Sequence, residues 1–194
     1  AVDGRRRWVY QRAVPALTVR NAAGLSVRDN LAFVGFAGGR LAAIALGNGG
    51  LRWEGAVALP RGATELERVA DVVGNPWVAE REVCAVAYQG RVACFDVANG
   101  QSIWARNFSS TTGLSADTRY LFITDDRSAV QALDRSNGTS YWKQDRLFLR
   151  QLTVPFPLGR QIAVVDIEGQ VHFMDRESGA LVGRVPTDPS GAVS

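Results

Sequence analysis

Several residue types that carry chemistry are scarce in this chain of 194 residues. It contains one lysine, one methionine and one histidine, His172. A single histidine excludes a histidine cluster for zinc and leaves one candidate general base of its kind. His172 lies in "GQVHFMDR", where Val171, Phe173 and Asp175 alternate with it. We therefore interpret it as a strand residue at the face of a sheet rather than as a catalytic group.

Long apolar runs and amphipathic helical patterns are missing as well. No run approaches the ~20 apolar residues of a membrane-spanning helix, and no window shows convincing helical periodicity. The net charge of +3 and the pI of about 9.2 fall short of the dense basic clusters of nucleic-acid binders. The tight basic run "GRRRW" at 4–8 is interpreted as a solvated strand edge. We expect no nucleic-acid partner.

The two cysteines, Cys84 and Cys94, lie on the two arms of "VCAVAYQGRVACFD". If "QG" forms a two-residue turn, Cys84 faces Phe95 and Cys94 faces Ala85. The two thiols then point to opposite sides of the sheet, so we expect no disulfide, although a register shifted by one residue would reverse this. We interpret them as small buried apolar residues, and their spacing fits no zinc site.

An internal repeat is the strongest positive signal. The segments "AIALGNGGLRW", "CFDVANGQSIW", "ALDRSNGTSYW" and "FMDRESGALVG" align, with a glycine four residues before a tryptophan position. In the last segment Gly183 occupies the tryptophan position. Gly4 lies four residues before Trp8 near the start of the chain and fits the same spacing. The tryptophans at the repeat positions are Trp8, Trp53, Trp104 and Trp142, and the glycines of the four segments are Gly49, Gly100, Gly138 and Gly179. Three of the segments carry an aspartate eight residues before the tryptophan position.

Each part of the repeat has a physical role. Glycine permits the positive φ of a tight turn, aspartate accepts backbone N–H bonds there, and the tryptophan ring packs between neighbouring units. Two further apolar strands precede each motif, so each unit is a four-stranded blade. The sequence predicts an all-β fold, a β-propeller of about four tryptophan-docked blades in one domain. The repeats lie near 8–53, 53–104, 104–142 and 142–183, with a tail at 184–194.

The chain opens inside a turn motif and stops in a loop, whereas closed propellers usually have four to eight blades. We expect it to be part of a longer propeller, and to self-associate or be unstable in isolation.

Aspartates at strand ends (Asp125, Asp126 and Asp166) are interpreted as turn caps.

One segment, "VALPRGATELERVADVVGNP" at 57–76, interrupts the strands. Its Thr64-x-x-Glu67 pattern is typical of a capping box and allows a single helical turn.

The Asp-x-x-x-Gly-x-x-x-Trp blade resembles the repeats of PQQ-like propellers. "GATELERVADVVGNPWV", followed by "VCAVAYQGRVACFDVANGQSIWAR", is similar to the BamB family. "PALTVRNAAG" at 15–24 matches as well. The resemblance covers almost all of this chain but about half of that family's eight blades.

The resemblance implies a non-enzymatic scaffold without a cofactor, held on the periplasmic face of the outer membrane by a lipid anchor. It implies binding to the POTRA domains of BamA and assistance to the insertion of β-barrel proteins. Unfolded barrel precursors are a further possible partner, by pairing with exposed blade edges. Cys84 and Cys94 are internal to a blade, so neither fits the anchoring cysteine, and the anchor lies outside this chain.

For the BamA contact, the resemblance implies two neighbouring interblade loops. One matches at Leu17, Val19 and Arg20, two apolar residues and a cation suited to an interface hot spot. The other matches at Asp71, which could orient Arg20. The second acidic position falls on Val73, so either the acidic half of the site is weaker here or its charge comes from Glu65 or Glu67.

Other readings of these residues stay open. Leu17 and Val19 also fit inward positions of a strand, Arg20 fits a solvated charge, and 57–76 fits a surface loop without a partner. A PQQ-like scaffold for another periplasmic partner is an alternative function. A quinoprotein dehydrogenase fragment is another, but it would need a Ca²⁺ ligand set and often adjacent cysteines, which the sequence does not show.

Overall fold

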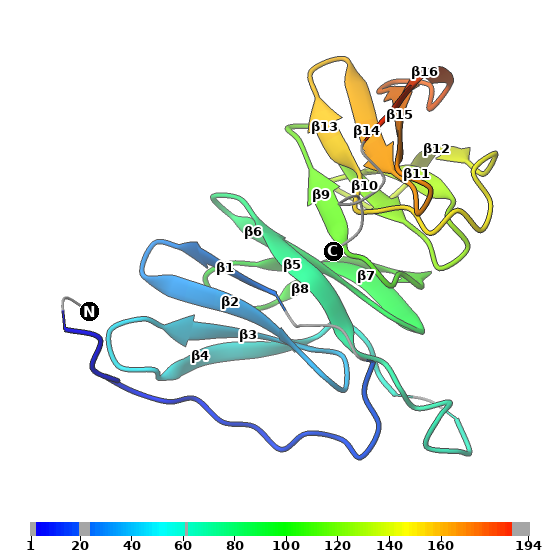
Figure 1. Cartoon of the computed structure of the whole chain (residues 1–194). Coiled ribbons are helices and arrows are strands. Elements are labelled where there is room, and N and C mark those ends of the chain that lie inside the picture. Colours follow the sequence, from blue (N-terminus) through cyan, green and yellow to red (C-terminus); the bar gives the residue numbers. More distant parts are fainter. Residues whose placement is uncertain (1–2, 20–23, 61, 188–194) are drawn as a thin grey trace.

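The computed structural model describes residues 3–19, 24–60 and 62–187. In these ranges sixteen strands form four separate sheets, with no α-helix (Figure 1). Each sheet is an antiparallel meander whose four strands follow one another in chain order. The predicted four-stranded blades are thereby confirmed. No helix in the described part of the chain is long and apolar enough to cross a membrane.

The four sheets are called the first to fourth blades. The first contains β1 (Leu25–Arg28), β2 (Leu31–Phe36), β3 (Arg40–Ala45) and β4 (Leu51–Ala56). The second contains β5 (Val72–Val78), β6 (Glu82–Ala87), β7 (Gly90–Asp96) and β8 (Ser102–Phe108). The third contains β9 (Leu114–Ala116), β10 (Tyr120–Thr124), β11 (Val130–Asp134) and β12 (Ser140–Gln144). The fourth contains β13 (Phe156–Leu158), β14 (Gln161–Val165), β15 (Gln170–Asp175) and β16 (Leu181–Pro186).

The middle strands of the blades carry the core. β3, β6 and β10 are almost entirely buried, and they read as continuous apolar runs. Strands covered on both faces need apolar side chains at every position, rather than at alternate ones. One core cluster joins Phe33 and Trp53 of the first blade to Val83 and Phe95 of the second. The blades therefore bury their faces against one another.

The repeated tryptophan and glycine meet across each joint rather than within one blade. At each of the four glycines, a Cβ would lie 2.4–2.6 Å from the ring of the preceding tryptophan. The pairs are Trp8 on Gly49, Trp53 on Gly100, Trp104 on Gly138 and Trp142 on Gly179. Each indole N–H also donates to the carbonyl three residues before that glycine, at 2.7–2.9 Å. We call this contact the tryptophan dock.

The turn that receives each ring has the predicted chemistry. The four glycines have φ between 69° and 74°, a conformation that glycine adopts without a Cβ penalty. Asp96 and Asp175 each accept two backbone N–H bonds at the start of their turns, and Asp134 accepts one. In these three turns the carboxylate helps to hold the shape on which the ring packs.

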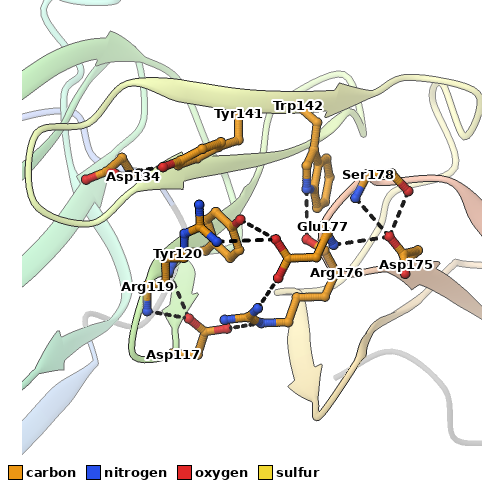
Figure 2. A network of polar contacts seen from close by, with 10 residues as sticks. All are labelled: Asp117, Arg119, Tyr120, Asp134, Tyr141, Trp142, Asp175, Arg176, Glu177 and Ser178. Atoms are coloured by element: carbon orange, nitrogen blue, oxygen red, sulfur yellow. Dashed lines mark hydrogen bonds and ion pairs between the residues drawn. The ribbon is translucent and has the colours of Figure 1, made fainter.

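Ion pairs reinforce two of the joints. Arg176, whose carbonyl accepts the Trp142 indole, pairs through its Nε with Asp117 of the third blade at 2.6 Å (Figure 2). Beside it, the buried Tyr120 donates to Glu177 at 2.5 Å, and burial together with this bond raises the pKa of Tyr120. Arg135 makes the equivalent contacts one joint earlier. Its carbonyl accepts the Trp104 indole, and its Nε pairs with Glu82 of the second blade at 2.6 Å. These pairs were not predicted.

The expectation of no disulfide is wrong. Val86 pairs with Val92, so Cys84 lies directly opposite Cys94, and their sulfurs are bonded. The hairpin turns at Tyr88 and Gln89, with Gln89 at a φ of 47°, and Gly90 already belongs to β7. The register therefore differs by one residue from the assumed one, and this brings both side chains to the same face. Both cysteines are fully buried, as expected.

His172 lies on β15 and is buried, which confirms the strand interpretation. Its Nε2 contacts Asp166 at 2.8 Å. Asp166 also caps its turn by accepting the N–H groups of Glu168 and Gln170. Burial opposes the charge of Asp166, but the bonds from His172, Gln170 and Arg150 lower its pKa to about 2. The carboxylate is a structural anchor of the fourth blade.

The tryptophan dock predicts a sharp difference between two Gly→Ala substitutions. At Gly138, with φ of 74°, a Cβ would lie 2.5 Å from the Trp104 ring. We expect Gly138→Ala to lower the free energy of unfolding by at least about 2 kcal/mol. Gly47→Ala is the control, since no atom lies within 4 Å of its Cβ position, and it should change stability by less than about 0.5 kcal/mol. Denaturant titration measures both, and equal effects would contradict the dock.

Candidate partner-binding site

The connections of each blade alternate between its two ends, because a meander reverses at every turn. The tryptophan docks occupy the turns between the third and fourth strands of the blades. The opposite end carries the turns between the second and third strands and the loops that link one blade to the next. The interruption at 57–71 is one such loop, and it lies beside the extended segment 15–19.

Local hydrogen bonds shape the 57–71 loop. The Glu67 N–H donates to the Thr64 hydroxyl at 3.3 Å, and the Glu67 carboxylate accepts the N–H groups of Thr64 and Ala63. These backbone bonds, from Thr64 first, lower the pKa of Glu67. The predicted capping box is confirmed, although the segment forms turns rather than a helix. Arg68 closes the loop by donating to the carbonyls of Gly62 and Ala63.

Asp71 fastens this loop to its surroundings. The residue is 6% exposed, and its carboxylate accepts the N–H of Val19 at 2.6 Å and that of Gly38 at 2.9 Å. Its own carbonyl accepts the N–H of Tyr88 at 2.9 Å. Asp71 therefore joins segment 15–19, the β2–β3 turn and the β6–β7 turn at one point.

A pocket of about 250 Å³ lies beside this junction. We call it the first-blade pocket; it is lined by Pro15, Ala16, Leu17, Gly38, Pro60, Glu65, Arg68 and Asp71. Its walls come from the segment that precedes the first blade, from the β2–β3 turn and from the loop that follows β4. The lining combines apolar side chains with two acids and one cation, so it offers both apolar contact and charge.

The structure brings three of the five predicted site residues into this pocket: Leu17, Glu65 and Asp71. Leu17 is 45% exposed and does not point into a core. Val19 is half-buried and offers its backbone to Asp71. Arg20 lies outside the described residues.

The acidic side of the pocket differs from the family pattern. Val73 is 2% exposed and packs in the core, so it presents no side chain to the pocket. Glu67 is engaged in its capping box, whereas Glu65 lines the pocket. Of the two substitutes considered for the missing charge, Glu65 is the one that the structure places there.

Sequence reasoning missed part of the site. Pro15, Pro60 and Arg68 also line the pocket. Leu59 and Leu66, on the loop itself, are 50% and 70% exposed. Sequence alone did not separate these exposed leucines from Val57, Ala58, Val69 and Ala70, which are buried in the same stretch.

Elsewhere in the described residues, one group could offer three metal ligands: Glu82, Cys84 and Cys94. Both sulfurs are used in the disulfide, so neither is a thiolate, and thiolates are the form that binds metal. We therefore assign no metal site to this group.

The fold defines a tryptophan-docked β-propeller, with a small pocket at its loop-bearing end. The family model described as "Outer membrane protein assembly factor BamB" matches residues 1–144. The chain belongs to the BamB family. The BamB protein of Bordetella pertussis is 47% identical over 195 residues, which cover 100% of this chain and 50% of that protein. That of Nitrosomonas eutropha is 43% identical, covering 97% and 46%. The chain thus spans about half the length of these relatives.

Comparison with solved structures supports the same family assignment. The crystal structure of BamB from Moraxella catarrhalis superposes with a TM-score of 0.90 at 30% identity, covering 97% of this chain and 56% of that one. A europium-containing methanol dehydrogenase superposes with a TM-score of 0.62 at 12% identity, a likeness of fold alone.

Asp71 offers a direct test of how the pocket is held. Asp71→Ala leaves the N–H groups of Val19 and Gly38 without their acceptor, so we expect a loss of about 1–3 kcal/mol in the free energy of unfolding. Amide hydrogen exchange at both residues should accelerate. Asp71→Asn keeps one acceptor oxygen and should cost less. Unchanged exchange at Val19 and Gly38 in the alanine variant would show that the carboxylate does not hold them.

Proposed function

We propose that this chain is part of a scaffold subunit of the outer-membrane protein assembly complex, and that it binds the POTRA domains of BamA through the first-blade pocket. The subunit then assists the folding and insertion of β-barrel proteins. Membership of the BamB family supports a role in outer-membrane protein assembly. The observation that carries the binding site is the convergence of Leu17, Glu65 and Asp71 on one pocket from segments far apart in the sequence.

The shape and chemistry of the pocket favour a protein partner. Leu17, Leu59 and Leu66 are each at least 45% exposed on or beside the same loops. Exposed apolar side chains around a small concavity are anchors that a partner can bury. The loop that bears them is held by Asp71 and the capping box, so little order would be lost on binding.

We propose the periplasmic face of the outer membrane as the location, with a lipid anchor outside this chain. The buried disulfide between Cys84 and Cys94 supports an oxidising compartment independently of the family. Disulfides persist in the bacterial periplasm and are rare in the cytosol.

The proposal excludes an enzymatic role. The one histidine is buried against Asp166, and the two cysteines are paired across strands rather than adjacent in the chain. The relatives at 40–47% identity are all described as assembly factors. A quinoprotein dehydrogenase fragment is disfavoured on these grounds, while a scaffold for another periplasmic partner is the alternative that the binding test decides.

The test is calorimetric titration of the protein with the isolated POTRA domains of BamA from the same organism. The full-length propeller and the present chain are both titrated. Leu17→Ser should weaken binding about tenfold or more, which is the effect of an interface anchor. Leu158→Ser is the matched control, because Leu158 is 46% exposed and Leu17 is 45% exposed. Arg20→Glu should also weaken binding.

The outcomes separate the parts of the proposal. Binding that Leu17→Ser and Arg20→Glu leave unchanged would keep BamA as the partner but reject this site. Binding by the full-length propeller alone would show that this half cannot hold its loops in isolation. Failure of both proteins to bind would reject BamA as the partner.

A further inference from the structure

A second and larger hollow lies on the third blade. Its volume is about 810 Å³, within the range of specific binding sites. We call it the third-blade cleft; it is lined by Thr111, Thr112, Asp125, Asp126, Ser128, Leu149, Gln151, Leu152, Thr153 and Val154. None of these residues belongs to the first-blade pocket.

The third-blade cleft is built like the first-blade pocket, two blades further along the chain. Its walls are the loop before the third blade, the β10–β11 turn of that blade, and the loop that follows β12. The first-blade pocket uses the corresponding three elements of the first blade. Both hollows therefore open at the same end of the propeller, opposite the tryptophan docks.

Two polar groups of the cleft are left without partners. The hydroxyl oxygen of Thr112 is buried and makes no hydrogen bond. The side chain of Asp126 is exposed, and among the described residues its carboxylate takes part in no hydrogen bond or ion pair. A buried polar atom without a partner costs free energy that a ligand can recover. Asp125, in contrast, caps its own turn and lies near Lys143.

The backbone around the cleft is strained. Ser128, Leu149 and Gln151 have φ of 70°, 58° and 50°, half of the six non-glycine residues with positive φ in the described ranges. The N–H of Gln151 donates to the Ser128 hydroxyl, and that of Leu149 to the Arg127 carbonyl, which hold the two loops in this shape. Such conformations cluster at binding sites. Here they leave Leu149 65% exposed at the rim.

The lining determines the class of ligand. No aromatic residue lines the cleft, so sugars and bases would find no stacking surface. Leu149, Leu152 and Val154 line the same cleft as the unpaired carboxylate of Asp126. We propose that the third-blade cleft binds an extended polypeptide segment in which a lysine or arginine neighbours an apolar residue. The cation would pair with Asp126, and the apolar side chain would cover Leu149.

The probe is an array of synthetic nine-residue peptides that places one lysine or arginine beside leucine, valine or phenylalanine in a serine-rich background. Fluorescence polarisation with the full-length protein measures the affinity of the strongest binder. Asp126→Lys should weaken it at least tenfold, because attraction becomes repulsion. Asp145→Lys is the matched control, exposed on the loop after β12 but outside the lining, and should change affinity less than twofold.

Replacing the basic residue of the peptide by glutamate should abolish binding. Leu149→Ser should also weaken binding, while Asp126→Lys should leave the affinity for POTRA domains unchanged. Absence of saturable binding across the array, or equal losses in Asp126→Lys and Asp145→Lys, would overturn the proposal. Because the POTRA titration is a separate measurement, failure here leaves the proposed function standing.

Discussion

The docking of each tryptophan on a glycine turn of the next blade is the contact on which the remaining structure depends. The ring fills the space that a Cβ would occupy, and its N–H satisfies a carbonyl in the same turn. The three joints between the four blades use this contact, and Trp8, from the segment before the first blade, docks on Gly49 in the same way. The angle between successive blades is therefore set by one repeated geometry. Burial of the ring against a turn that Asp96 or Asp175 already holds requires little further ordering.

The tryptophan docks occupy one end of the blades and leave the other end free to bind partners. Arg135 and Arg176 add ion pairs to the last two joints, whereas the corresponding residue of the second blade is Val97, which has no charge to pair. The joint between the first and second blades instead carries the 57–71 loop, fastened by Asp71. Both hollows lie at this loop-bearing end, where variation in length and charge leaves the docks undisturbed.

The blades could be predicted from the sequence, because the Gly-x-x-x-Trp spacing and the paired apolar strands follow local rules. It was insufficient for the Cys84–Cys94 bond, since one residue of hairpin register decides whether the two side chains share a face. For the candidate site, Leu17 and Asp71 followed from the family resemblance. The role of Asp71 as an acceptor for two distant backbone groups depends on tertiary contacts that no local pattern contains.

The third-blade cleft was also beyond prediction, because its parts come from three separate segments. Its equivalence with the first-blade pocket becomes visible only when the blades are compared in space. By setting the joints between blades, the docks at one end should also fix the loops at the other end. Amide hydrogen exchange in Trp53→Ala tests it most directly. The account predicts faster exchange at Val19, at Gly38 and across 62–71, with the fourth blade unchanged. Exchange that accelerates only around Gly100, where the ring docks, would contradict it.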